Sequence, residues 1–63
     1  MDGRRFRRIR KRLGLSQRAL AERMGTTENT VARWERDEIP IRELVERFIL
    51  LVEKVEAPLK KRR

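Results

Sequence analysis

Cysteine, histidine and tyrosine are absent from this 63-residue chain, and Ser16 is its only serine. Without cysteine, the chain has neither a disulfide framework nor a thiolate metal site. Without histidine, and with a single serine, it lacks most of the usual general bases and activated nucleophiles. We therefore expect no enzyme activity, no cofactor and no bound metal ion.

Long hydrophobic runs are also absent. The longest apolar run, Phe48 to Val52, is far shorter than the ~20 residues that span a bilayer. The arginine-rich N-terminus has no apolar stretch behind it, which argues against a signal peptide. Membrane-surface binding by residues 4–13 is disfavoured, because their apolar face consists only of Phe6, Ile9 and Leu13. We expect a cytoplasmic protein with no membrane partner.

A chain of this length holds one domain, whose core is marginal without help from a partner or ligand. Its net charge of +8 and pI of about 11.5 indicate a polyanionic partner, with nucleic acid as the first candidate. Residues 1–12 carry a charge of +6 and residues 60–63 carry +4, whereas residues 13–59 carry −2. We expect a domain at residues 1–57, followed by a basic C-terminal tail at residues 58–63.

Capping residues and periodic apolar positions predict four helices. Asp2, Ser16 and Thr27 are each placed to cap the start of a helix. The predicted helices are about Gly3 to Leu13, Ser16 to Gly25, Glu28 to Arg36, and Pro40 to about Glu56. Gly14 is expected to stop the first helix and Pro58 to close the fourth.

The fourth predicted helix has an apolar stripe roughly 160° wide, which is broader than one core contact needs. The stripe consists of Leu44, Val45, Phe48, Ile49, Leu51, Val52 and Val55. Leu50 lies alone on the opposite, polar side. This excess of apolar surface predicts a homodimer through the fourth helix, with Ile49 and Leu50 in the interface and Val45 or Glu53 nearby.

Residues 15–36 are predicted to form two short helices that pack at a steep angle. Ala21 is small where the helices approach, Gly25 takes the turn, and Val31 with Trp34 holds the second helix against the first. The matching stretches are Gly14-Leu15-Ser16-Gln17, Leu20-Ala21, Gly25 and Trp34-Glu35-Arg36. They resemble the phage repressor/Cro-like (xenobiotic-response-element type) helix-turn-helix family, over about Phe6 to Ile41.

The resemblance implies an all-α, lambda-repressor-like fold, with four helices and a possible fifth. Its second and third helices would form the helix-turn-helix, and the third would enter the major groove of double-stranded DNA. Arg10 and Glu35 occupy positions that often form an ion pair in the family. Asp37 stands where the family usually has glycine, and Asp tolerates a left-handed conformation less well.

The resemblance also implies which residues contact DNA. Gln17 matches a glutamine that anchors a phosphate. The implied base contacts are Thr27, Glu28, Asn29 and Arg33, with Thr30 and Arg36 closer to the backbone. The chemistry agrees, since arginine binds guanine and asparagine binds adenine in a bidentate way. Glu28 has three open roles: accepting from cytosine N4, repelling a phosphate or capping its own helix.

The sequence thus predicts a DNA-binding transcriptional regulator, which binds a two-fold operator as a homodimer. We expect a repressor rather than an activator, because 63 residues leave no room for a separate activation domain. One alternative is an autoregulating antitoxin that binds a small protein partner through the fourth helix. Another is a protein-interaction module that has lost DNA binding, although Asn29, Arg33 and Arg36 argue against it.

Overall fold

The computed structural model describes the backbone of residues 1–61 and the side chains of residues 1–55. Within this part of the chain there are four helices and no strand: α1 (Gly3–Arg12), α2 (Gln17–Met24), α3 (Glu28–Glu35) and α4 (Glu43–Lys61). The predicted all-α, four-helix fold is therefore confirmed.

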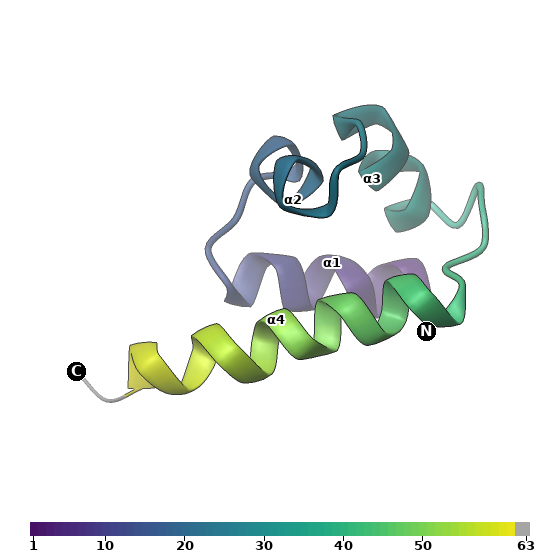
Figure 1. The fold of residues 1–63 in the computed structure, drawn as a ribbon. Coiled ribbons are helices and arrows are strands. Elements are labelled where there is room, and N and C mark those ends of the chain that lie inside the picture. The colour runs from purple at the N-terminus through teal and green to yellow at the C-terminus, as the bar shows by residue number, and fades with distance from the viewer. Residues whose placement is uncertain (62–63) are drawn as a thin grey trace.

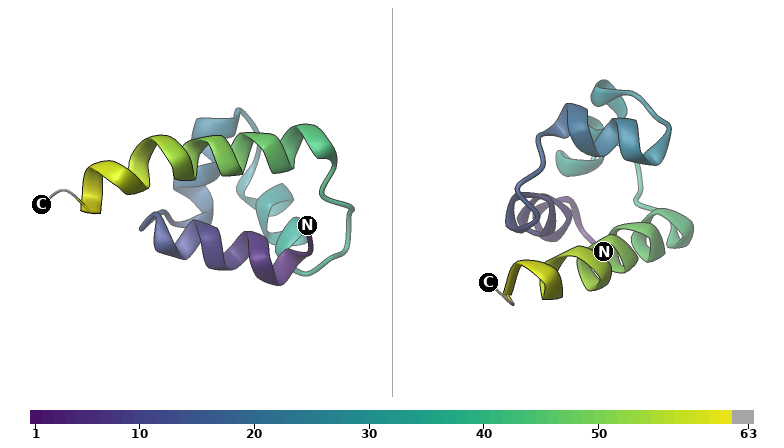
Figure 2. Two further views of the ribbon diagram at one scale, coloured as in Figure 1. Left: turned by 90° about the horizontal axis from the view of Figure 1, so that it is seen from below. Right: turned by 60° about the vertical axis from the view of Figure 1, so that its left-hand side comes forward.

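The helices form two layers. α1 and α4 lie side by side and run in the same direction, and α2 and α3 lie on the other side of α1 (Figures 1 and 2). α2 packs on α3, while α1 packs on both α3 and α4. The C-terminal part of α4 extends past the end of α1 (Figure 1). α1 is thus the central element, which supports the helix-turn-helix pair on one side and α4 on the other.

The three predicted capping residues act as caps. Each side chain accepts a hydrogen bond from the backbone N–H three residues later: Asp2 from Arg5 at 2.8 Å, Ser16 from Ala19 at 3.0 Å, and Thr27 from Thr30 at 3.2 Å. A cap satisfies one of the backbone donors that a helix start leaves unpaired. The local sequence therefore fixes where α1, α2 and α3 begin.

These three helices also end in the same way. The residue after each last turn is left-handed: Gly14 at φ 75°, Gly25 at φ 76° and Asp37 at φ 61°. At each end, the N–H groups of this residue and of the next one donate to carbonyl groups of the last turn. This is the Schellman arrangement, which glycine adopts without steric cost. Asp37 adopts the same conformation despite its side chain.

The core lies between α1 and the other helices. Its buried apolar side chains are Phe6, Ile9, Leu13, Leu20, Ala21, Val31, Trp34 and Ile49. The rings of Phe6 and Trp34 pack with centroids 5.7 Å apart at 54°. The predicted inward faces of α1, α2 and α3 are therefore confirmed, and Trp34 is a core residue.

The predicted start of the fourth helix was wrong, because α4 begins at Glu43 and not at Pro40. Ile39 and Ile41 are both partly buried against the core, whereas Pro40 between them is exposed. Side chains two positions apart share a face only when the backbone is extended. Burial of both isoleucines thus keeps this segment out of the helix.

The predicted end of the fourth helix was also wrong, since α4 continues past Pro58 to Lys61. Proline has a φ close to the helical value, but inside a helix it removes one hydrogen bond and its ring crowds the carbonyl four residues earlier. The α4 helix continues through Pro58 at this cost in stability. The side chains of residues 56–63, including the basic run from Lys60 to Arg63, lie outside the described residues.

The predicted contact of Ile49 with a second copy was wrong, because Ile49 is fully buried in the core. Leu50, which was predicted to lie alone on the polar side, packs partly against the core. The side of α4 that carries Ile49 and Leu50 therefore faces the core. A contact of Leu50, Val45 or Glu53 with a second copy stays a prediction. The apolar side chains left exposed in the described part of α4 are Leu44, Leu51 and Val55.

The start of α1 lies unusually close to the end of α3. The backbone N–H of Gly3 donates to Asp37 Oδ1 at 2.8 Å. A Cβ atom at residue 3 would overlap the carbonyl oxygens of Trp34 and Glu35. Glycine is therefore required at this position by the close approach of the two helices.

We expect Gly3→Ala to destabilise the protein by about 1–3 kcal/mol, because the added methyl group overpacks this contact. Urea unfolding followed by circular dichroism measures the change. The control is Arg4→Ala on the exposed face of α1, which should stay within about 0.5 kcal/mol. An alanine that raised the stability by about 0.5–1 kcal/mol, as at an open helical position, would contradict the close approach.

Candidate nucleic-acid interface

The α2 and α3 helices form the helix-turn-helix, and a turn at Gly25 and Thr26 separates them. Gly25 is left-handed, and the N–H of Thr26 donates to the carbonyl of Ala21 at 2.9 Å. Leu20 and Ala21 of α2 pack against Val31 and Trp34 of α3 in the core. The opposite face of α3 is thus left free for a partner.

A buried ion pair ties α3 to α1. Arg10 Nε donates to Glu35 Oε2 at 2.5 Å, and Arg10 Nη2 donates to Glu35 Oε1 at 3.2 Å. The Arg10 and Glu35 side chains are only 9% and 5% exposed. The predicted ion pair is therefore confirmed, in a bidentate geometry.

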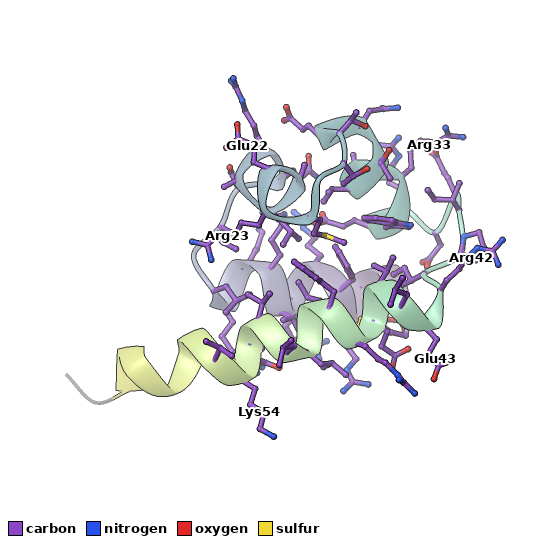
Figure 3. All side chains as sticks on the ribbon, viewed as in Figure 1. Glu22, Arg23, Arg33, Arg42, Glu43 and Lys54 are labelled. Atoms are coloured by element: carbon purple, nitrogen blue, oxygen red, sulfur yellow. The ribbon has the colours of Figure 1, made fainter. Side chains whose placement is uncertain are left out.

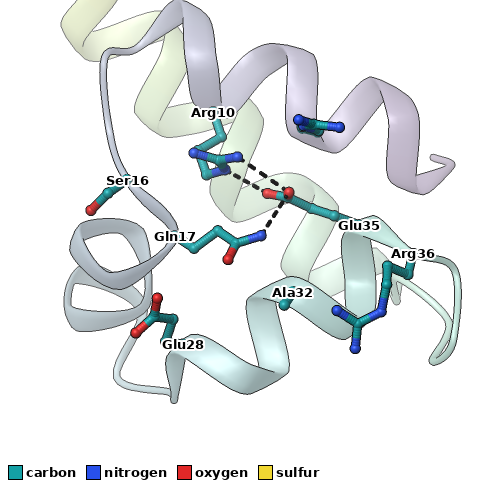
Figure 4. Close-up of a pocket in the computed structure, with 8 residues that line it drawn as sticks. Arg10, Ser16, Gln17, Glu28, Ala32, Glu35 and Arg36 are labelled. Atoms are coloured by element: carbon teal, nitrogen blue, oxygen red, sulfur yellow. Dashed lines mark hydrogen bonds and ion pairs between the residues drawn. The ribbon is translucent and has the colours of Figure 1, made fainter.

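The same pair reaches the start of α2. Arg10 Nη1 donates to the carbonyl of Leu15 at 2.8 Å, and Gln17 Nε2 donates to Glu35 Oε1 at 3.1 Å. Figure 4 shows Arg10 and Gln17 converging on Glu35 from two different helices. Three helices thus meet at one carboxylate, which fixes how α2 and α3 lie relative to α1.

This network forms the floor of an open cleft of about 570 Å³ between α1, the start of α2 and α3. The cleft is lined by Arg7, Arg10, Ser16, Gln17, Glu28, Ala32, Glu35 and Arg36. Three arginines face two glutamates there, and one arginine and one glutamate already neutralise each other in the floor. Arg7 and Arg36 are both exposed at this cleft.

The residues predicted to contact DNA lie around this cleft and along the exposed face of α3. Thr27, Glu28, Asn29, Arg33 and Arg36 are exposed, whereas Gln17 and Thr30 are partly buried. Arg33 points away from the core, on the side of the molecule opposite to Lys54 of α4 (Figure 3). The hydroxyl groups of Thr27 and Thr30 share a hydrogen bond of 2.9 Å at the start of α3.

Two of these arginines contact a carboxylate that sequence reasoning did not single out. Arg36 Nε donates to Glu38 Oε2 at 2.7 Å, and Arg33 Nε lies 3.5 Å from Glu38 Oε1. The hydrogen bond from Arg36 lowers the pKa of the Glu38 carboxyl, and the same contact raises the pKa of the Arg36 guanidinium. Glu38 is therefore a carboxylate at neutral pH.

Arg7 is a second residue that was missed. It lies three positions before Arg10 on α1, and residues at this spacing share one face of a helix. Once Arg10 was assigned to the contact with Glu35, this spacing could have placed Arg7 at the same cleft. Glu38 gave no such signal, because its position depends on the turn after α3.

The comparison with protein families identifies the family to which this arrangement of helices belongs. The family model described as helix-turn-helix matches residues 6–45, which is more than half of the chain. The chain belongs to the phage repressor/Cro-like helix-turn-helix family. It is accordingly a DNA-binding helix-turn-helix regulator.

Other comparisons add no relative. No match was found among curated proteins or among solved structures. In the described residues, no group of histidine, cysteine, aspartate and glutamate side chains is suited to hold a metal ion. No helix in this part of the chain is long and apolar enough to cross a membrane.

We expect Arg10→Met to cost about 3–5 kcal/mol, because it leaves the buried Glu35 carboxylate without its partner. Thermal unfolding followed by circular dichroism measures the loss. The matched control is Arg12→Met, which removes another arginine contact of 2.5 Å, to Glu53, where the arginine is 56% exposed. That change should cost at most about 1 kcal/mol.

A second variant separates the ion pair from side-chain packing. Arg10→Met combined with Glu35→Leu removes the stranded charge, so the double variant should be more stable than Arg10→Met alone. Equal costs for Arg10→Met and Arg12→Met would show that the buried pair does not hold the three helices together.

Proposed function

We propose that the protein is a sequence-specific transcriptional repressor, which binds a two-fold operator in double-stranded DNA as a homodimer. The observation that carries the proposal is the exposed face of α3, where Asn29 and Arg33 stand beside a basic cleft at the start of α2. A domain of this kind represses by occupying the operator, which needs no activating surface.

The face of α3 supports direct reading of base pairs. Arg33 reaches guanine O6 and N7, and Asn29 reaches adenine N6 and N7, each through two hydrogen bonds. Thr27 and Glu28 are proposed to contact neighbouring base edges from the first turn of the helix. Thr30 lies closer to the DNA backbone.

The cleft beside α3 supports binding of the phosphate backbone. Gln17 anchors a phosphate at the start of α2, and Arg7 and Arg36 supply positive charge at the same cleft. These contacts are independent of sequence and weaken as salt rises. They set the position of α3, so that its side chains meet the base edges.

The exposed face of α4 supports the homodimer. Leu44, Leu51 and Val55 are 80%, 59% and 57% exposed, and Phe48 between them is partly buried. The four positions are separated by four, three and four residues, which is the spacing of a coiled-coil seam. Pairing with a second copy would cover this face and place two α3 helices on half-sites ~10 bp apart.

The division into a domain at residues 1–57 and a basic tail at residues 58–63 stays a prediction. α4 runs across this boundary to Lys61, while the tail's side chains lie outside the described residues.

We expect Arg33→Ala to weaken binding to the preferred duplex by about 1–3 kcal/mol and to relax the preference at one base pair. Selection from a random duplex library identifies the preferred sequence, and fluorescence anisotropy measures both affinities. Arg47→Ala on α4 removes an equally charged, exposed side chain and should change neither. Equal weakening on preferred and scrambled duplexes would make Arg33 a phosphate contact.

We expect Leu51→Glu to give a folded monomer that binds the preferred duplex much more weakly. The exposed position tolerates a charge in the monomer, but the change buries that charge in the seam of a dimer. Sedimentation equilibrium at high micromolar concentration measures the association. Lys54→Gln makes the same change in net charge beside the seam, and it should leave the dimer intact.

An unmodified protein that is monomeric without DNA would contradict a preformed dimer. The apolar face of α4 would then be open to a small protein partner, as in an autoregulating antitoxin.

A further inference from the structure

A contact with α1 fixes the conformation of the turn that follows α3. Asp37 is left-handed at φ 61°, a conformation that costs free energy for residues other than glycine. Its carboxylate accepts a hydrogen bond of 2.8 Å from the backbone N–H of Gly3, at the start of α1. This contact stabilises Asp37 in that conformation and attaches the turn to α1.

The backbone of this turn determines where Glu38 lies. The N–H of Asp37 donates to the carbonyl of Trp34 at 3.1 Å, and the N–H of Glu38 donates to the carbonyl of Arg33 at 2.9 Å. In a Schellman motif, these two bonds bring the side chain of the last residue beside that of the residue five positions earlier. The motif usually joins two apolar side chains there, but in this protein it joins Glu38 and Arg33.

Two arginines therefore contact the Glu38 carboxylate. Arg36 binds both of its oxygens, with Nε at 2.7 Å and Nη2 at 3.3 Å, and Arg33 Nε lies 3.5 Å away. All three side chains are exposed. Arg33 is the proposed guanine contact, and Arg36 is a proposed phosphate contact, so one carboxylate competes with DNA for both.

We propose that Glu38 is a specificity-determining residue, which holds Arg33 and Arg36 back from phosphates but lets the terminal nitrogens of Arg33 reach the base that Arg33 recognises. The inference rests on the proposed function and deepens it. On an unrelated sequence, the two arginines gain only phosphate contacts, and each must give up Glu38 to make one. On the preferred sequence, Arg33 gains two hydrogen bonds to a guanine through its terminal nitrogens, while its Nε stays beside Glu38.

The balance between these contacts makes Glu38 effective. A bidentate guanine contact uses the two terminal nitrogens of Arg33, so the Nε contact with Glu38 is kept on the preferred duplex. A phosphate contact moves the guanidinium to the DNA backbone and loses Glu38, in exchange for an interaction that water and salt screen. Glu38 also repels phosphates near α3. It should therefore weaken binding to unrelated DNA much more than binding to the preferred duplex.

The test compares Glu38→Gln with the unmodified protein on a preferred and a scrambled duplex, over a range of salt concentrations. We expect affinity for the scrambled duplex to rise roughly three- to tenfold at about 0.1 M salt. For the scrambled duplex, the slope of log affinity against log salt concentration should become steeper by about one unit, because one more phosphate contact releases counterions. Affinity for the preferred duplex should rise less than about twofold, which reduces the ratio of the two affinities.

Glu43→Gln is the matched control. Glu43 is exposed and contacts Arg47 at 2.7 Å, so its removal makes the same change in net charge and also releases an arginine. Glu43 and Arg33 lie far apart in Figure 3, with Glu43 at the start of α4. This variant should leave the ratio of the two affinities unchanged.

Two results would overturn the inference and leave the proposed function intact. One is an equal rise on both duplexes for Glu38→Gln, and the other is a Glu43→Gln effect as large as that of Glu38→Gln. An unmodified protein that binds both duplexes equally would instead overturn the proposed function, and the role of Glu38 with it. Nuclear magnetic resonance of the arginine Nε–H groups in the DNA-free protein should show Arg33 and Arg36 shifting in Glu38→Gln alone.

Discussion

The proposed DNA-binding surface depends on one buried contact, the ion pair between Arg10 of α1 and Glu35 of α3. Neither charge can be left alone in the core without a large loss of stability, so the two helices stay together. Because the pair also binds the Leu15 carbonyl and the Gln17 side chain, the start of α2 follows the same constraint. The cleft between these helices is therefore preorganised.

The second constraint is the contact between Gly3 and Asp37, which joins the same two helices at the other end of α1. It gives Asp37 the left-handed backbone that the turn needs and sets Glu38 beside two exposed arginines. Glu35 and Glu38 thus act in opposite settings. The first carboxylate is buried and holds the fold, while the second is exposed and is proposed to compete with DNA for Arg33 and Arg36.

The sequence predicted what depends on local chemistry. Caps at Asp2, Ser16 and Thr27, the glycine turns and the inward-facing residues of the first three helices follow from hydrogen bonding and periodicity. The ion pair came from the family resemblance. Which face of α4 meets the core was not predictable, because its apolar stripe is wide enough for several orientations. Ile49 was therefore misplaced, and Glu38 was missed because its position depends on a tertiary contact.

The central claim is that α3 and the start of α2 form the DNA-binding surface, while α1 and α4 support it. The most direct measurement is titration of the isotope-labelled protein with the selected duplex, followed by backbone amide resonances. The largest changes should occur at residues 27–36 and 16–17, with smaller ones at Arg7. Changes centred on the exposed side of α4, with α3 unaffected, would contradict the claim.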